Sequence, residues 1–317
     1  MRADLSRRWL LRLASATGPG MLLAACGAQG GTSGGGPSTK SEYVVAPLQG
    51  AFGELATDLS RGKPLGDFLA KETGLTVKVY PPGDYTRSVT GLRDGSLDFA
   101  FVPALLYLRA HDDSGADPLF RTLRPGVDGK PAPAFTSIIA VRADGGISTA
   151  GDLKGKRVAA IDATDATGWV LPAAQLKKAG LDPARDVTVE YRKDGPDALV
   201  QVLNKKSDAA FAAKHDLSDP VVAKVDPSAA QTLKLLTTIE NAPLEVVVAR
   251  KGLDAKVLAK FKVAFQGLGD PQKATFTSNG KTQPILAQWG VSSLAETKDG
   301  DYAALREAAK AIGVKLK

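Results

Sequence analysis

Apolar residues along the first part of this chain fall into short runs that alternate with longer stretches of helical periodicity. Runs at 43–46, 76–80 and 97–102 have the β-branched or alternating pattern of strands. The segments between and after them repeat apolar residues every three or four positions, which predicts helices over 52–69, 85–93 and 103–110. Gly74 and Gly95 stand where two of these helices are expected to end.

The same rhythm continues through the rest of the chain. Strands are predicted at 138–141, 158–161, 187–191, 209–212, 233–237 and 244–250, with helices at 167–179 and 197–203. The C-terminal part is predicted to be helical, at 257–268, 271–277, 284–289 and 302–312. Strands that alternate with helices are typical of an α/β protein with mainly parallel sheets flanked by helices.

The mature part of the chain, roughly 275 of its 317 residues, exceeds what a single compact core usually contains, and this predicts two lobes. From the order of the predicted strands, the chain is expected to leave the first lobe near Ser137 and to return to it near Val246. We therefore expect lobe 1 to contain residues 42–136 and 246–317, and lobe 2 residues 137–245. Two such crossings form a hinge, and the carboxyl ends of parallel strands face the cleft between the lobes, which is the expected ligand site.

One strand-loop-helix segment has the chemistry of an anion site. The strand at 158–161 leads into Asp162-Ala-Thr-Asp-Ala-Thr-Gly, and the predicted helix follows. A loop of this kind directs free backbone N–H groups toward one point, and Thr164 and Thr167 add hydroxyl groups. The segment therefore favours an oxyanion ligand.

The first 26 residues have the pattern of an export signal. A basic start (Arg2, Arg7, Arg8) precedes an apolar run that is too short for a comfortable membrane span. The run ends in Leu-Ala-Ala-Cys26, which resembles a bacterial lipobox with a lipidated cysteine; the alternative is an ordinary secretory signal with an incidental cysteine. Residues 27–41 are rich in Gly and Ser and are expected to be a flexible linker.

These features predict an exported protein that lipidated Cys26 anchors to the extracytoplasmic face of the cell membrane. Ser6-Arg-Arg-Trp-Leu-Leu-Arg also resembles the twin-arginine export motif, although paired arginines occur in other signals too. Cys26 is the only cysteine, so a disulfide framework is excluded.

Charge and composition narrow the function classes. The whole chain has a formal net charge of +7. The export signal contains four Arg and one Asp, so its removal leaves a net charge of +4. This excess would attract small anions, or it reflects only a solvated surface. No Lys/Arg block is interleaved with aromatic residues, so nucleic-acid binding is not expected. His111 and His215 are the only histidines, and no metal-ligand, Ser-His-Asp or Gly-rich nucleotide motif occurs, so we expect no catalytic residue, metal or cofactor.

Six segments, in their order and spacing, resemble solute-binding proteins of the phosphonate/phosphite/phosphate ABC-transporter family. They are Asp84-Tyr, Gly95-Ser-Leu-Asp-Phe-Ala-Phe-Val, Ser137-Ile-Ile-Ala-Val-Arg, Asp152-Leu-Lys-Gly-Lys-Arg, Thr167-Gly-Trp-Val-Leu-Pro and Asp301-Tyr-Ala-Ala-Leu-Arg. The resemblance covers nearly all of residues 43–314. It implies the two-lobed periplasmic-binding-protein fold, and a monomer that captures a small oxyanion and delivers it to an ABC permease.

The resemblance also implies ligand contacts. Tyr85 matches a family tyrosine that contacts the ligand, and Phe135 stands where the family commonly has a second tyrosine. Two acidic positions that bind an amine in some relatives fall near His215 and Glu245. Glu245 keeps a carboxylate at the return to lobe 1, whereas His215 or the preceding Lys214 would offer positive charge to an anion.

The anion loop departs from the family pattern. The usual Ser-Thr-Ser is replaced by Asp165, Ala166 and Thr167. Asp165 either caps the helix, or accepts a hydrogen bond from a protonated ligand oxygen, or indicates a ligand other than a phosphonate-type anion. A family histidine that grips the anion would fall near Gly195 or Pro196, and neither residue can replace it.

Three functions follow from these observations. The leading hypothesis is a lipid-anchored binding protein for a small oxyanion or amino-oxyanion. The second is a divergent binding or sensor lipoprotein for another small anion, such as a sulfonate or carboxylate. An enzyme on the same scaffold is the less favoured third alternative, since a fold alone does not determine function.

Overall fold

The computed structural model describes residues 40–48, 59–81, 83–126 and 128–316. The predicted signal peptide with Cys26, nearly all of the predicted linker at 27–41, and residues 52–58 of the first predicted helix lie outside these ranges. Within the described ranges the chain forms two separate sheets flanked by helices, and a small hairpin. The α/β architecture expected from the sequence is therefore confirmed.

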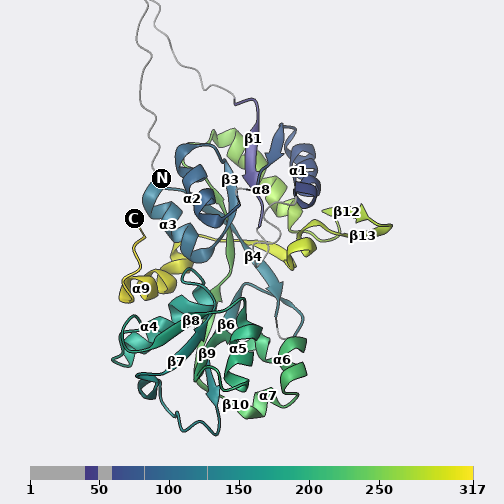
Figure 1. Cartoon of the computed structure of the whole chain (residues 1–317). Helices are drawn as coiled ribbons and strands as arrows, with labels where there is room; N and C mark the ends of the chain where they lie inside the picture. The colour runs from purple at the N-terminus through teal and green to yellow at the C-terminus, as the bar shows by residue number, and fades with distance from the viewer. Residues whose placement is uncertain (1–39, 49–58, 82, 127, 317) are drawn as a thin grey trace, which may run out of the picture. The chain divides into compact units, whose positions relative to one another are not determined.

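Seven strands form the first sheet, in the upper part of Figure 1. Its order is β14-β4-β11-β3-β1-β2, and β5 pairs with β4. The strands are β1 (Tyr43–Ala46), β2 (Val77–Val79), β3 (Phe99–Pro103), β4 (Asp117–Pro125), β5 (Pro131–Ala132), β11 (Glu245–Ala249) and β14 (Ser293–Glu296).

Helices cover both faces of the first sheet. On one face, α1 (Leu59–Thr73) and α8 (Ala255–Leu268) bury Leu65, Leu69, Phe261 and Phe265 against the phenylalanines of β3. On the other face lie α2 (Tyr85–Asp94), α3 (Ala104–Ser114) and α9 (Ala303–Ala311). The helix α2 ends as predicted at Gly95, whose φ of 81° suits glycine.

Five strands form the second sheet, in the order β10-β6-β9-β7-β8. They are β6 (Ala134–Arg142), β7 (Arg157–Ala160), β8 (Thr188–Tyr191), β9 (Ala209–Ala213) and β10 (Leu233–Pro243). The helices α4 (Leu171–Lys178) and α5 (Gly195–Leu203) contribute to its two apolar clusters, and the shorter α6 (Pro220–Val225) and α7 (Ala229–Thr232) follow β9. The chain enters this sheet after β5 and leaves it between β10 and β11; the predicted lobe boundaries stay a prediction.

Three sequence expectations need correction. Both sheets are mixed rather than mainly parallel, because β6, β10, β11, β4 and β14 all pair antiparallel with their neighbours. The predicted helix at 271–277 is wrong: Thr275–Ser278 is strand β12, which pairs with β13 (Lys281–Pro284). The segment at 284–289 is helical, but it is the 3₁₀ turn η4 (Ile285–Trp289).

One apolar cluster contains residues from both halves of the described chain. Leu305 and Ala309 of α9 belong to it together with Val102 and Leu105 near the first sheet. Ala166, Val170 and Leu171, which precede and begin α4, belong to the same cluster. The helix α9 contacts α3 on one side and α4 on the other (Figure 1). The two sheets thus share part of one hydrophobic core.

A fully buried carboxylate stabilises the start of the first sheet. Asp98 accepts hydrogen bonds from Lys40 Nζ at 2.7 Å, Val44 N at 2.8 Å and Arg250 Nε at 2.8 Å. A buried carboxylate needs such partners to offset its desolvation. The Gly95–Val102 family marker therefore contains a structural residue.

In the described part of the chain, no helix is long and apolar enough to span a bilayer.

Candidate functional site

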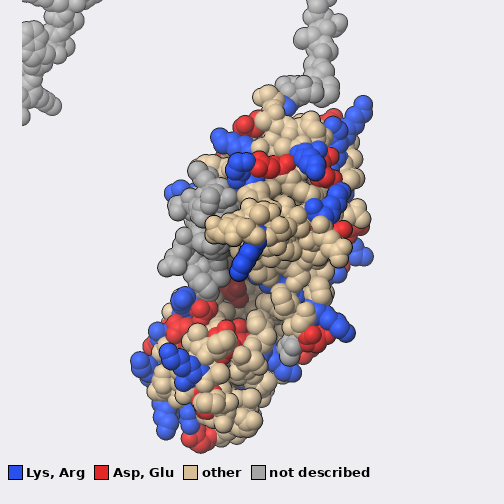
Figure 2. Space-filling view, turned by 90° about the vertical axis from the view of Figure 1, so that its right-hand side faces the viewer, with Lys and Arg blue, Asp and Glu red and all other residues tan. Residues whose placement is uncertain are grey.

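A cavity of about 550 Å³ lies between the two sheets, and we call it the inter-sheet cavity. The first-sheet side contributes Tyr85, Pro103, Ala104, Arg124, Glu245, Gln288 and Trp289. The second-sheet side contributes chiefly Ile161, Asp165, Ala166, Thr167, Asp194, Gly195, His215, Asp216 and Asp219. Phe135 and Leu244 line it where the chain passes between the sheets. Figure 2 shows acidic side chains in the hollow between the upper and lower parts of the described chain.

The structure brings together most of the residues singled out from the sequence. Tyr85, Phe135, Asp165, Ala166, Thr167, His215 and Glu245 all line the inter-sheet cavity. Thr164 is not among its lining residues; its hydroxyl donates to the carboxylate of Asp162 at 2.5 Å. Lys214 lines a neighbouring surface pocket instead. Whether these residues contact a ligand stays a prediction.

The predicted anion loop forms the π-helical turn η2 (Ala166–Val170) before α4. Val170 N donates to Asp165 O at 3.0 Å, the wide spacing of a π-turn, which is common at functional sites. Ser137 Oγ of β6 donates to Thr167 O at 2.5 Å and fixes the loop to the second sheet. Gly168 is required here, because a Cβ on it would lie 2.4 Å from Ile161.

Asp165 caps this turn, since its Oδ1 accepts the N–H of Gly168 at 2.5 Å. The same side chain lines the cavity, so capping and ligand contact are compatible. Burial raises the pKa of Asp165 above its ordinary value, and the N–H groups of Gly168 and Thr167 only partly offset this. The loop therefore presents a carboxylate where the family resemblance implied hydroxyl groups.

An ion pair occupies the first-sheet side of the cavity. Arg124 donates to Glu245 through Nη2 at 2.7 Å and Nε at 3.2 Å, a two-point contact, and through Nη1 to Trp289 O at 2.7 Å. Thr122 Oγ1 donates to Glu245 at 2.7 Å. Burial alone would raise the pKa of Glu245, but Arg124 and Thr122 outweigh burial and hold it below the ordinary value. Glu245 is therefore ionised and already paired with a cation of the protein.

Three further aspartates line the second-sheet side. Asp194 caps α5 by accepting from Asp197 N at 2.7 Å, and Asp219 caps α6 by accepting from Val221 N at 2.8 Å. Asp216, only 9 % exposed, accepts from Ala213 N at 2.8 Å. Burial chiefly, with a smaller contribution from nearby carboxylates led by Asp219, raises the pKa of Asp216 to about 7, and the hydrogen bond from Ala213 N opposes this only in part.

Asp216 also explains why position 195 is glycine. A Cβ on Gly195 would lie 1.9 Å from Oδ2 of Asp216 and 2.7 Å from its Cγ. The resemblance places an anion-gripping histidine at or beside this position. In this chain the carboxylate of Asp216 fills that space instead.

His215 lies between aromatic and acidic neighbours. Its ring packs on Phe135 with centroids 4.1 Å apart, and its Nε2 lies 3.4 Å from Oδ1 of Asp216. Burial, and then the positive charge of Arg124, lower the pKa of His215. The imidazole is therefore neutral at pH 7 and contributes a hydrogen-bonding group rather than a charge.

Sequence reasoning missed Arg124, Asp194, Asp216 and Asp219. Arg124 lies on β4, a strand that the apolar pattern did not predict. Asp194 and Asp219 carry a recognisable signal, because each precedes a proline at the start of a helix. No comparable signal marks Asp216.

Among the described residues, no group of three or more His, Cys, Asp or Glu is arranged to hold a metal ion.

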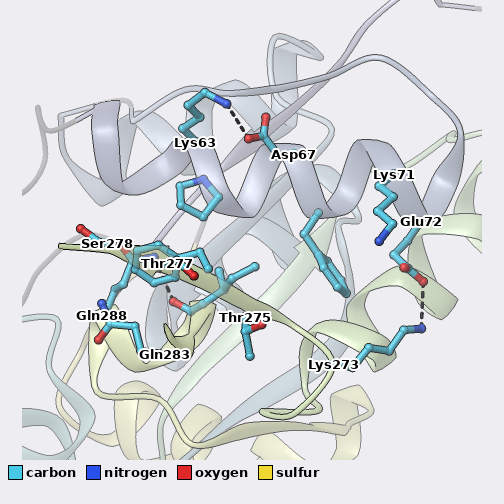
Figure 3. A pocket seen from close by; sticks show the side chains of 14 residues that line it. Lys63, Asp67, Lys71, Glu72, Lys273, Thr275, Thr277, Ser278, Gln283 and Gln288 are labelled. Atoms are coloured by element: carbon cyan, nitrogen blue, oxygen red, sulfur yellow. Dashed lines mark hydrogen bonds and ion pairs between the residues drawn. The ribbon is translucent and has the colours of Figure 1, made fainter. Parts of the chain in front are cut away.

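A larger groove, of about 950 Å³, lies between α1, the β12–β13 hairpin and η4 (Figure 3). Four of its charged side chains form two ion pairs, Lys63 with Asp67 at 2.5 Å and Lys273 with Glu72 at 2.9 Å. None of the residues predicted to bind ligand lies in this groove. Volume alone therefore does not identify the site; the convergence of polar groups in the inter-sheet cavity does.

The chain crosses between the two sheets and leaves a polar cavity between them. This arrangement is typical of proteins that bind a small solute between two lobes. The model of the family described as "ABC transporter, phosphonate, periplasmic substrate-binding protein" matches residues 55–302, more than half of the chain. The chain belongs to this family of extracytoplasmic solute-binding proteins.

Individual relatives are more distant. The phosphate-import protein PhnD of Mycolicibacterium smegmatis is 25 % identical over 265 residues, covering 79 % of this chain and 80 % of that protein. The tetrathionate sensor histidine kinase TtrS of Salmonella typhimurium is 33 % identical over 156 residues, 48 % of this chain but only 26 % of the kinase. The structure of PhnD1 from Prochlorococcus marinus with methylphosphonate has a TM-score of 0.61 at 17 % identity, covering 87 % of this chain and 99 % of that one. This last likeness supports the fold alone.

Proposed function

We propose that this chain captures a small solute with an oxyanion group in the inter-sheet cavity and delivers it to an ABC permease. The single observation that carries the proposal is the cavity itself, which collects polar groups from both sheets at the chain crossings. Family membership supports the transport role. The name of the mycobacterial relative, a phosphate-import protein, supports an oxyanion.

We assign the oxyanion end of the solute to Arg124 and Tyr85, with Thr167 as a further donor. Arg124 is the one arginine or lysine among the described residues that line the cavity. A guanidinium group can donate five hydrogen bonds, and Arg124 uses three of them for Glu245 and Trp289 O. Its planar fork suits phosphonate, phosphate, sulfonate and carboxylate oxygens.

The lobes predicted from the sequence, 42–136 with 246–317 and 137–245, are part of the proposal. Binding between them would close the cleft by rotation about the two crossings. We also propose that the protein is a monomer and has no enzymatic activity. Turnover of any bound solute in a product assay would contradict this.

Anchoring by lipidated Cys26 is a further part of the proposal. Two or more acyl chains on one cysteine bind a protein firmly to a bilayer. Cys26→Ser should move the protein from the membrane fraction to the soluble or secreted fraction. Equal membrane association of the wild type and the variant would refute the lipid anchor without affecting the ligand site.

A thermal-shift screen, followed by calorimetry, tests the binding function. The panel contains phosphate, phosphite, alkyl- and aminoalkylphosphonates, sulfonates, tetrathionate and carboxylates. We expect at least one of these solutes to raise Tm and to bind with micromolar or tighter affinity. The absence of any shift across the panel would refute the proposal.

The screen also separates a second candidate, a sensor for a sulfur oxyanion, which the similarity to the tetrathionate sensor favours. Binding of tetrathionate but of no phosphorus compound would support that candidate.

A further inference from the structure

A second, smaller pocket of about 230 Å³ lies at the end of the second sheet that is remote from the inter-sheet cavity, and we call it the distal pocket. Its lining comes from the end of β6 at Arg142, from the turn that follows, and from the loop between α5 and β9. Phe135, which lines the inter-sheet cavity, stands at the other end of the same strand, about 20–25 Å away. The two sites share no lining residue.

One residue of the distal pocket has a buried polar group that its neighbours leave unsatisfied. Ser207 lines the pocket and is only 2 % exposed, and its hydroxyl has no hydrogen-bond partner among the described residues. A buried hydroxyl without a partner costs stability, and such groups are rare in folded proteins. A ligand that accepts hydrogen bonds in this pocket would supply the partner.

The backbone beside Ser207 is in a conformation that is unfavourable for the residue it contains. The helix α5 ends in a Schellman motif, in which Lys205 N donates to Val202 O at 3.0 Å and Lys206 N donates to Gln201 O at 2.8 Å. This motif puts Lys205 in the left-handed region, with a φ of 61°. A side chain with a Cβ is strained there, and glycine is the usual residue.

The chain uses glycine at the ends of other helices. Gly95, Gly115 and Gly180 follow α2, α3 and α4 with φ values of 81°, 68° and 85°. Positive charge at the end of α5 does not account for the lysine, because Lys206 supplies such charge one position later without a positive φ. The strained Lys205 lines the distal pocket, so we look for its role there.

The carboxylates of the distal pocket are already paired with arginines. Arg142 donates to Asp144 through Nε at 2.8 Å and Nη2 at 3.0 Å. Asp208 accepts from the backbone N–H of Arg157 at 2.8 Å and from its guanidinium group. These pairs leave Lys205 as the charged lining residue without an ion-pair partner among the described residues.

The balance of charge around the pocket is positive. Arg142, Arg157 and Lys205 contribute three positive charges, and Asp144 and Asp208 two negative ones, which leaves +1.

The next charges that act on these pairs, Asp226 on Arg142 and Lys156 on Asp208, have opposite signs. Arg142 also keeps donors to spare, because Asp144 and Leu203 O use three of its five N–H groups.

We propose that the distal pocket binds a compact oxyanion such as sulfate or phosphate, with Lys205 Nζ, Ser207 Oγ and the spare N–H groups of Arg142 as its donors. The volume of the pocket lies below the range that holds drug-sized ligands, which favours a single small ion. The bound ion would connect the end of β6 to the loop that precedes β9. This site is additional to the solute site of the inter-sheet cavity and does not depend on the function proposed for it.

An NMR titration of the full chain with sodium sulfate, at an ionic strength held constant with sodium chloride, locates the anion. We expect the backbone amide signals of residues 142–147 and 205–208 to shift and to saturate with an apparent Kd below about 10 mM. Constant ionic strength separates binding from charge screening. Shifts confined to residues of the inter-sheet cavity, or shifts at the distal pocket that never saturate, would overturn the inference and leave the proposed function standing.

Three variants test the assigned donors. Lys205→Gly should weaken sulfate binding at least fivefold, and Ser207→Ala at least threefold. Lys206→Ala is the matched control, since it removes the same charge from an exposed neighbour that does not line the pocket, and it should stay within twofold of the wild type.

The Lys205→Gly variant has a second readout that separates lost binding from lost folding. Without sulfate its Tm should equal or exceed that of the wild type, because glycine relieves the left-handed backbone. A lower Tm would contradict the strain assigned to Lys205. Equal weakening of sulfate binding by Lys205→Gly and Lys206→Ala would show that only the general charge of the loop matters, and the inference would be wrong.

Discussion

Replacing Gly195 by alanine tests the closest contact in the cavity wall. The added Cβ would overlap Oδ2 of Asp216 at 1.9 Å and Cγ at 2.7 Å, and it meets no other residue within 3.4 Å. The backbone at Gly195 does not have a positive φ, so alanine itself fits the local conformation. The whole cost therefore arises from moving one carboxylate.

The magnitude follows from two opposing effects. Displacing the carboxylate of Asp216 strains the wall and breaks its 2.8 Å hydrogen bond with Ala213 N, which costs about 2–4 kcal/mol. Alanine in place of glycine near a helix start returns about 0.5 kcal/mol through the unfolded chain. We therefore expect Gly195→Ala to lower the free energy of unfolding by about 1.5–3.5 kcal/mol.

The test is a double-mutant cycle measured by urea unfolding. Asp216→Ala removes every atom that the new methyl group would touch, so in that background Gly195→Ala should be neutral or slightly stabilising. The expected coupling between the two substitutions is the displacement cost itself, about 2–4 kcal/mol. If Gly195→Ala has the same effect in both backgrounds, the assigned contact between Gly195 and Asp216 is wrong.

Three further predictions concern charged groups. Glu245→Gln should destabilise the protein by about 2–4 kcal/mol, because it leaves the largely buried Arg124 without its carboxylate partner. Urea unfolding measures this loss of stability, and a loss below about 0.5 kcal/mol would contradict the prediction. Asp216 has a pKa raised to about 7, so the folded state binds a proton that the unfolded state releases near pH 4, and stability from this group is lost as pH rises from 4 to 7. Asp216→Asn should remove about 2–4 kcal/mol of that decline between pH 5 and 8, and an unchanged profile would refute the assignment. Asp98→Asn should lower the stability of the folded state, measured by thermal unfolding, by about 3 kcal/mol, and Lys40→Ala by about 1 kcal/mol or less. The difference is expected because Asp98 is fully buried and Lys40 is partly exposed. A larger loss for the lysine variant would contradict this order.

Local patterns predicted most of the fold, and the failures have physical causes. The strands β1, β3 and β9 were predicted to within two residues at each end, because apolar runs of this kind are buried on both faces. The strand β4 was not predicted, since its register against β11 is interrupted by a bulge and its alternation is imperfect.

The β12–β13 hairpin was predicted as a helix although its turn contains a strong signal. Asn279 and Gly280 have φ values of 50° and 72°, as two-residue hairpin turns require. The Thr-Phe-Thr-Ser run before this turn pairs across it with Lys281–Pro284. Over a segment this short, the apparent helical periodicity indicated the structure less reliably than the turn signal did.

The candidate site was predicted where one segment supplies several lining residues. The loop at 164–167 could be recognised because strand, loop and helix follow one another in sequence. Arg124 and Asp216 could not be recognised, because they meet the cavity only after β4 and β9 have paired with distant strands. The charge of a cavity is a property of the folded chain, and the modest positive charge of the whole sequence gave no indication of five carboxylates in one place.

The apolar cluster that α9 shares with both sheets has a consequence for how the protein unfolds. Leu305 and Ala309 contribute to the same core as Val102 near the first sheet and Val170 beside the second. Neither half can lose its structure without exposing part of the core of the other. Calorimetry should therefore record a single cooperative transition in which the van't Hoff and calorimetric enthalpies agree, rather than two independent meltings.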